Sequence, residues 1–276
     1  MLTTARSIIK HYGTGYYRAT FLFPKNIREA VWTLYQFVRL PDEIVDNPTA
    51  QSGTDLDAWI QSWKTAVETR TTDNDTFVSF LPIIDRYQIP VTYTYDFFAA
   101  MRQDLTKDRY ETYEELEQYM HGSATVVGYM ISHIVGFQEG ALPYARALAE
   151  AFQMTNFLRD IKEDYDERRR IYIPREDMKQ FGVTEAHIRE GIVDDAWRAL
   201  MQYEINRARA LYARGIAGIP MLSPHGRKAV YAAALIYKKI LDKIEEQGGD
   251  VFTKRLVVSP FQKTVLLWKA LWSRNQ

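Results

Sequence analysis

The sequence predicts an all-α protein. Apolar residues recur over almost the whole chain with the period of about 3.6 residues typical of an amphipathic helix. No segment shows the alternation of apolar and polar residues expected of a half-buried strand. Proline and glycine interrupt the pattern at intervals that suit helix ends. The 276 residues, 46% of them hydrophobic, suffice for a large core, and because no linker divides them we expect one domain, residues 1–276.

The expected helices lie near residues 3–11, 26–46, 55–69, 75–87, 91–105, 112–137, 141–164, 184–190, 193–214, 225–246 and 260–273. The breakers that support these divisions are, in chain order, Pro24, Pro48 with Gly53, Pro82, Pro90, Gly140 with Pro143, Pro174, Gly182, Pro220 with Pro224, and Gly248 with Gly249. Two longer stretches, about 165–183 and 247–259, are expected to be non-helical. Both contain arginines, and long loops in a compact helical domain are usually functional.

Composition excludes several classes of function. Lys plus Arg and Asp plus Glu number 35 each, so no overall charge favours nucleic acid as a partner. The absence of cysteine excludes disulfides, thiolate catalysis and cysteine-ligated zinc, and no histidine pair has zinc-site spacing. No apolar run approaches the roughly 20 residues of a membrane span. We expect a cytoplasmic protein, with peripheral membrane contact through the amphipathic segment 260–276 as the alternative to packing of that segment on the core.

The segment 153–174 contains a polar ladder within an otherwise apolar helix. Asn156, Asp160 and Asp164 are four residues apart and therefore share one helix face. Burying stacked carboxylates is costly unless a cation compensates them. Oxygen ligands at this spacing suit a divalent ion such as magnesium. Arginines follow directly at 168–170, and metal-binding acids beside guanidinium groups suit a diphosphate.

A second acidic pair repeats this spacing. Asp42 and Asp46 stand four apart, with Glu43 beside the first and Arg39 one turn before it. Pro41 is expected to kink the helix or restart it just before Asp42. One such pair is usually a solvated helix face. Two pairs, each in a largely apolar helix with an arginine nearby and a loop following, favour a two-sided metal and diphosphate site.

These residues resemble the signatures of the squalene/phytoene synthase family. The pattern Y-x-x-x-R-x-x-D-(D/E)-x-x-D is matched by Tyr35, Arg39, Asp42, Glu43 and Asp46. The pattern Q-x-x-N-x-x-R-D-x-x-E-D, followed by R-(I/V)-Y-x-P, is matched by Gln153, Asn156, Arg159, Asp160, Glu163, Asp164, Arg170, Ile171, Tyr172 and Pro174. Two further segments resemble the flap and C-terminal regions of the family and contribute Tyr119, Tyr237 and Arg255.

The resemblance implies a single-domain, isoprenoid synthase-type helical bundle with a central cavity. It also implies head-to-head condensation of two allylic diphosphates through a cyclopropylcarbinyl diphosphate. Magnesium, with manganese as an alternative, would be bound by Asp42, Asp46, Asn156, Asp160 and Asp164. The implied catalytic residues are the four aspartates and Tyr119. The implied substrate-binding residues are Tyr35, Arg39, Gln153, Arg159, Tyr237 and Arg255.

Within the family, the segment 28–50 is more similar to the phytoene branch, which implies geranylgeranyl diphosphate as substrate, carotenoid biosynthesis, and no NADPH. The small Thr20 would leave the tail slot open if it and Trp32 both face the cavity. The alternatives are a C30 enzyme that makes squalene or dehydrosqualene from farnesyl diphosphate, a non-catalytic helical binding or assembly protein, and an unrelated helical metal-binding protein. Monomer and homodimer both remain open.

Two positions depart from the family pattern. Gly13-Thr14-Gly15-Tyr16 stands where the family has S-x-S-F, so hydroxyl contacts to a diphosphate are lost there unless backbone amides replace them. Arg169 stands where a glycine is common, and we expect its side chain to be solvated, with a phosphate contact as the alternative.

Overall fold

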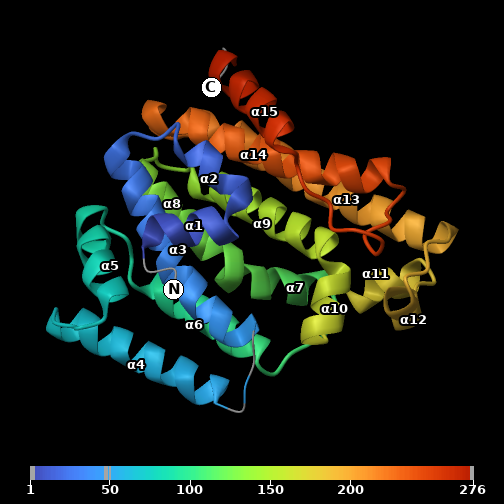
Figure 1. Ribbon diagram of the computed structural model, residues 1–276, viewed down its shortest axis with the longest axis horizontal. Helices are drawn as coiled ribbons and strands as arrows, with labels where there is room; N and C mark the ends of the chain where they lie inside the picture. The colour runs from blue at the N-terminus through green and yellow to red at the C-terminus, as the bar shows by residue number, and fades with distance from the viewer. Residues whose placement is uncertain (1–3, 47–48, 50, 274–276) are drawn as a thin grey trace.

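The computed structural model describes residues 4–46, 49 and 51–273, apart from the Thr14 side chain. Its helices (Figure 1) are α1 (Ala5–Tyr12), α2 (Thr14–Thr20), α3 (Lys25–Asp46), α4 (Ser52–Thr69), α5 (Asp75–Arg86), α6 (Thr92–Asp104), α7 (Tyr113–Met120), η1 (His121–Thr125), α8 (Val126–Val135), α9 (Leu142–Arg159), α10 (Ile161–Arg168), α11 (Arg175–Gln180), α12 (Glu185–Glu190), α13 (Asp195–Ala217), η2 (Ile219–Met221), α14 (Pro224–Glu246) and α15 (Pro260–Trp272). Within these residues no strand forms beyond two isolated bridges. The predicted all-α fold is confirmed.

Helix α9 lies in the middle of the bundle. It packs against α13 and α14 on one side and against α8 and η1 on the other (Figure 1). Helix α3 contacts α1, α5, α6 and α8, so its C-terminal end comes to lie across from the end of α9. Most buried apolar side chains of α2 through α15 belong to one contiguous core.

Capping side chains explain several of the helix starts. Asn74 Oδ1 accepts a hydrogen bond from the backbone N–H of Thr76 at 3.0 Å, which begins α5. Asp194 Oδ1 accepts one from Trp197 at 2.9 Å and begins α13. Ser259 and Gln262 form a capping box at the start of α15.

The segment 112–137 was expected to be one helix, and this is wrong in one respect. A π-helical turn, η1, separates α7 from α8. A π turn contains one residue more than an α turn. The apolar residues before and after it keep the spacing of an α-helix, so the sequence pattern does not reveal the extra residue.

Two short helices were missed. Helix α2 occupies residues that lay between the expected helices 3–11 and 26–46, and Gly13 and Gly15 are accommodated at its start. Helix α11 lies within the stretch 165–183, which was expected to be non-helical, and it begins directly after Pro174. The expected helix 3–11 began at Thr3, which lies outside the described residues.

Helix α3 runs without interruption through Pro41, so of the two expected effects, a kink or a restart, the restart before Asp42 does not occur. Proline removes one backbone donor, but tertiary packing compensates for its effect. Pro41 is buried, and the preceding turns are held by Phe37, whose ring lies 4.6 Å from that of Trp63 and 4.3 Å from that of Phe80.

A buried ion cluster connects α11 to α13. Arg207 Nη1 lies 2.7 Å from Asp177 Oδ2 and 2.7 Å from Glu204 Oε2, and both carboxylates are buried. The guanidinium also lies over the Tyr113 ring, 4.1 Å from its centroid. Burial raises the pKa of Glu204 to about 8, with Arg207 opposing this shift and Asp177 adding to it.

The Glu204→Gln variant is therefore expected to lose less free energy of unfolding than the wild type when the pH is raised to alkaline values. Because the pKa of Glu204 is higher in the folded protein than in the unfolded chain, its stabilising contribution is complete below about pH 4 and is lost as the pH rises through about 8. Between pH 5 and pH 9, the wild type should lose roughly 1–3 kcal/mol more free energy of unfolding than the variant. Urea denaturation at both pH values measures this. Equal losses in the two proteins would contradict the prediction, and Glu29→Gln on the exposed surface of α3 is the control.

Candidate active site

A cavity of about 800 Å³ lies between α3 and the α9–α10 segment. Every site residue expected from the sequence lines it. These residues are Tyr35, Arg39, Asp42, Asp46, Tyr119, Gln153, Asn156, Arg159, Asp160, Asp164, Tyr237 and Arg255. Chain segments far apart in sequence are thus brought to one site.

One wall carries the acids of α3. Arg39 contacts the carboxylates of Asp42 and Glu43, which are three and four residues further along the same helix. Its Nη1 also lies 3.5 Å from Asp46 Oδ2. The guanidinium rests over the Tyr12 ring, 4.4 Å from the centroid.

The opposite wall carries the second ladder. The helix expected over 141–164 is divided at Asp160, whose φ and ψ are −104° and 12°, and it continues as α10 to Arg168. The ladder survives this bend, because Asp160 N–H still bonds Asn156 O at 2.9 Å and Asp164 N–H bonds Asp160 O at 2.8 Å. Arg159 Nε donates to Asp160 Oδ1 at 2.8 Å, and Arg255 binds both oxygens of Asp160 at 3.0 and 3.1 Å.

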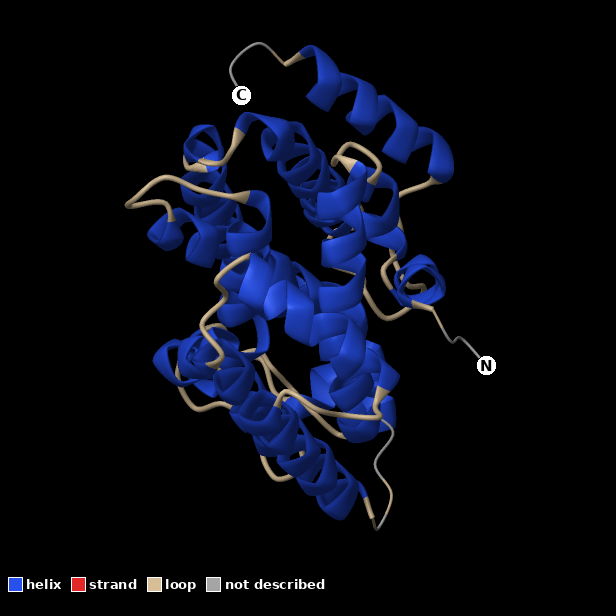
Figure 2. Ribbon diagram, turned by 90° about the vertical axis from the view of Figure 1, so that its left-hand side faces the viewer, coloured by secondary structure: helices blue, strands red, loops and turns tan. Residues whose placement is uncertain are grey.

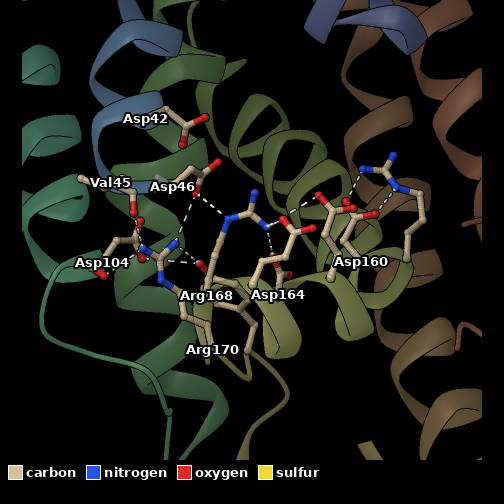
Figure 3. Close-up of polar contacts among 12 residues, drawn as sticks. Asp42, Val45, Asp46, Asp104, Asp160, Asp164, Arg168 and Arg170 are labelled. Atoms are coloured by element: carbon tan, nitrogen blue, oxygen red, sulfur yellow. Dashed lines mark hydrogen bonds and ion pairs between the residues drawn. The ribbon is translucent and has the colours of Figure 1, made fainter. Parts of the chain in front are cut away.

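Two arginines that follow the second ladder reach the first (Figure 3). Arg168 lies between them, with Nε 3.1 Å from Asp46 Oδ1 and Nη1 3.3 Å from Asp164 Oδ1. Arg170 is buried beside it, with Nη1 3.4 Å from Asp46 Oδ1 and Nη2 donating to the carbonyls of Val45 and Asp104 at 2.9 Å each. The arginines next to the second ladder therefore neutralise the first ladder too.

Asp104, at the end of α6, lines the same cavity and was not identified from the sequence. Its carboxylate accepts hydrogen bonds from Tyr119 Oη at 2.8 Å and Tyr172 Oη at 3.5 Å. The ring of Tyr172 stacks on Phe157 with centroids 4.0 Å apart. A single aspartate at a helix end carries no spacing signal, so only the fold reveals it.

Burial sets the electrostatics of the acids. It raises the pKa of Asp42 to about 7, with the charge of Asp46 adding to the shift, and that of Asp164 to about 8, with Asp160 adding. It also raises the pKa of Asp104 to about 6, although Arg170 opposes this. The Asp42 side chain is 32% exposed, yet protein atoms surround its carboxylate closely enough for burial to be the largest cause of the raised pKa. The cavity therefore favours added positive charge.

The donor set fits a hard divalent cation. Carboxylate oxygens stand on both walls, and the buried Asn156 Oδ1 has no hydrogen-bond partner although Asn156 lines the cavity. No three carboxylate or imidazole groups in the described part of the chain lie close enough to hold one ion among them. Arginines contact the aspartates of both walls instead. Ligands from the protein would therefore be few for each ion, which suits magnesium, since it commonly completes its shell with water and phosphate oxygens.

The rest of the cavity is apolar. Val31 lines it eleven residues before Asp42, so it extends about 16 Å along α3 at 1.5 Å per residue. Thr20 lines it, but Trp32 does not, so only the first half of the condition stated for these two residues is met. The Trp32 indole stands behind Thr20 and donates from Nε1 to Thr20 Oγ1 at 2.9 Å.

The two departures from the family pattern have structural explanations. Gly15 lines the cavity where a Cβ atom would lie only 2.7 Å from Tyr237 Cε2, so the tyrosine ring fills the space of a side chain. Arg169 ends α10 with φ of 58°, a left-handed conformation that glycine adopts without strain. Its side chain is exposed and lies near the Tyr165 ring, which agrees with the solvated interpretation.

Comparisons with known proteins agree with this geometry. Residues 9–262 match the model of the squalene/phytoene synthase family. The chain is 35% identical over 286 aligned residues to the 15-cis-phytoene synthase of Synechocystis sp., covering 98% of this chain and 84% of that protein. It is 35% identical over 269 residues to the chloroplastic phytoene synthase of Daucus carota, covering 94% and 67%.

Solved structures extend the likeness to the fold. A dehydrosqualene synthase crystallised with a ligand is similar with a TM-score of 0.90 and 27% identity, over 97% of this chain and 94% of that one. The squalene synthase HpnC from Alicyclobacillus acidocaldarius is similar with a TM-score of 0.81 and 26% identity, over 88% and 92%. With the signature residues gathered around one cavity, these matches show that the chain belongs to the squalene/phytoene synthase family.

Proposed function

We propose that the protein is a prenyltransferase that joins two geranylgeranyl diphosphates head to head into phytoene, with release of diphosphate, in carotenoid biosynthesis. The observation that carries this proposal is the pair of acidic ladders at one end of a long apolar cavity, in a chain 35% identical to a 15-cis-phytoene synthase. Such a cavity suits a charged diphosphate head and a prenyl tail.

In this proposal, magnesium would be held by Asp42 and Asp46 on one wall and by Asn156, Asp160 and Asp164 on the other. When bound, the metal would neutralise the diphosphates and the charge that develops as the allylic C–O bond ionises. Arg39, Arg159 and Arg255 would exchange contacts with these aspartates for bidentate contacts with phosphate oxygens. Tyr35, Gln153 and Tyr237 line the cavity and would orient the substrates.

The aromatic side chains serve the carbon chemistry. Tyr119 and Tyr172 are held by their hydroxyl groups on Asp104, and their rings stack with centroids 5.7 Å apart. Burial raises the pKa of Tyr119 well above its usual value, so the phenol stays neutral. Neutral aromatic faces stabilise a nearby allylic cation without trapping it, and the apolar walls exclude the water that would quench it.

The test is incubation of the purified protein with magnesium and labelled C20 or C15 diphosphate, with and without NADPH. We expect a C40 hydrocarbon from the C20 substrate in the absence of NADPH. The second candidate, a C30 synthase, is favoured by the similarity to a dehydrosqualene synthase structure, and a product from the C15 substrate alone would establish it. A strict NADPH requirement for the coupled product would indicate a squalene synthase, and no product with either substrate would indicate a non-catalytic role.

Thr20→Phe is expected to shift substrate preference toward the C15 diphosphate. The side chain is buried and lines the cavity, so a phenyl ring there shortens the tail slot. One isoprene unit adds five carbons, whose burial is worth roughly 2–4 kcal/mol. We therefore expect the C20 to C15 ratio of kcat/KM to fall by at least about 30-fold, with magnesium dependence unchanged.

Thr20→Val is the matched control for this measurement. It removes the hydroxyl that accepts from Trp32 but adds no bulk, so the ratio should stay within about threefold of the parent. An unchanged ratio in Thr20→Phe would show that this position does not limit tail length.

A further inference from the structure

The outer face of α15 carries an exposed apolar stripe. Phe261 is 77% exposed, Val265 50%, Trp268 58% and Trp272 77%. At 100° per residue, these four positions fall within about 60° of one another around the helix. The opposite face is packed, since Ala270 is 1% exposed. One face of α15 therefore packs on the core, as expected from the sequence, and the opposite face is exposed to solvent.

The position of α15 makes this stripe accessible. The helix packs mainly on α14 at the outer edge of the bundle (Figures 1 and 2). Val257, in the loop just before it, is 62% exposed and adds to the same segment. Large exposed aromatics at regular helical spacing are typical of an interaction surface, whereas scattered apolar residues are not.

Charge distinguishes this segment from the rest of the chain. Residues 251–276 contain five basic residues and no acidic residue, so the remaining 250 residues carry a formal net charge of −5. Lys269 is exposed beside the stripe. Arg18 of α2 is bound to the start of α15, with Nη1 3.2 Å from Pro260 O and 3.3 Å from Thr264 Oγ1. Arg255 of this segment is bound to Asp160 at the cavity, but Lys254 and Lys269 are exposed. The overall neutrality of the protein therefore conceals positive charge in the segment that carries the aromatic stripe.

The same segment borders the cavity. Val257, Val258 and Lys263 are among its lining residues. This step rests on the proposed function: a C40 hydrocarbon has negligible solubility in water, and it must leave the cavity into an apolar phase. A surface that connects the cavity to an apolar phase would let the hydrocarbon leave without entering water.

We propose that α15 docks the protein on the surface of an anionic lipid bilayer, with Phe261, Val265, Trp268 and Trp272 inserted at the headgroup boundary. Basic residues beside an aromatic face are the pattern of an interfacial helix. No helix of the described residues is long and apolar enough to cross a bilayer. The contact is therefore with one leaflet and is reversible.

The experiment is co-sedimentation with vesicles of phosphatidylcholine and phosphatidylglycerol in equal amounts, without magnesium or substrate. The wild type should bind, and binding should weaken at high salt and with phosphatidylcholine alone. Trp268→Glu should lower the partition coefficient at least about tenfold. Val78→Glu is the matched control, because Val78 is 52% exposed on α5, and binding should change less than about twofold.

Each outcome decides the proposal. Trp268 does not line the cavity, so turnover of detergent-dispersed C20 diphosphate by Trp268→Glu should equal that of the wild type. If the wild type does not turn over the C20 diphosphate, the proposed function is overturned but lipid docking is not, since vesicle binding is measured without substrate. Absence of wild-type binding, or equal binding by Trp268→Glu, would overturn lipid docking. Light scattering provides a further test. A wild-type dimer that does not bind vesicles, and that dissociates in Trp268→Glu, would also overturn lipid docking, because the stripe would then bind a second copy of the chain.

Discussion

Asp160→Ala is expected to lower kcat/KM for the C20 diphosphate by at least about a thousandfold, and Asp42→Ala is expected to do the same. Each substitution removes a carboxylate from one wall of the cavity, so ions can no longer be held between that wall and the diphosphate. The fold should persist. In the apo protein each aspartate lies near another acid, and removing one relieves repulsion that now opposes burial.

The measurement is steady-state turnover across a magnesium titration, with circular dichroism and thermal unfolding to verify folding. Asp166→Ala is the control, since Asp166 lies on the same helix as Asp164 but pairs with Lys162 at 3.2 Å and is 49% exposed. Its activity should stay within about twofold of the wild type. Near-normal activity of either Asp160→Ala or Asp42→Ala would refute the two-walled metal site.

Arg170→Ala should destabilise the protein by about 3–5 kcal/mol, the largest stability effect that we expect. The guanidinium is buried and donates to the carbonyls of Val45 and Asp104, while its charge faces Asp46. Without it, two buried carbonyls lose a donor and the acids of α3 lose a compensating charge. Arg170→Lys keeps the charge but has no planar fork to reach both carbonyls, so its loss should be intermediate.

Guanidinium denaturation with a common m-value measures these changes. Arg255→Ala is the comparison, because Arg255 also binds an aspartate of the cavity but its side chain is 53% exposed. Its cost should not exceed about 1 kcal/mol. Similar losses for Arg170→Ala and Arg255→Ala would mean that Arg170 does not connect α3, α6 and the loop after α10.

Residue spacing predicted the acidic part of this site, and the family resemblance supplied its tyrosines, Gln153 and Arg255. The four aspartates and Asn156 share helix faces because positions four apart do so in any helix, and embedding in apolar helices directs that face to an interior cavity. The bend at Asp160 leaves this relation intact, since the i to i−4 hydrogen bonds continue through it. Element boundaries were less predictable, because Gly15 and Pro41 oppose helix formation locally and tertiary packing overrides them.

Contacts between distant segments could not be predicted in this way. Asp104 joins the site only because α6 ends beside Tyr119 and Tyr172. Arg168 was recognised as a neighbour of its own ladder, but its contact with Asp46 depends on how α3 crosses the end of α10. The sequence did not decide whether Trp32 faces the cavity. It stands behind Thr20, because the approach of α2 to α3 decides which side chain reaches the cavity.

Because of the π turn η1, the orientation of the cavity wall formed by α8 depends on how many residues the segment 121–125 contains, and less on which residues they are. Tyr119 and Ile131 both line the cavity, yet twelve residues of regular α-helix would set them about 120° apart. Because the π turn takes up one extra residue, the two side chains come within about 20° of each other. Deleting a single residue from 121–125 would rotate α8 by about 100° and turn Val127, Ile131 and Val135 away from the substrate. No substitution reproduces that rotation, so insertions and deletions in this segment matter more than exchanges of side chains when related sequences are compared.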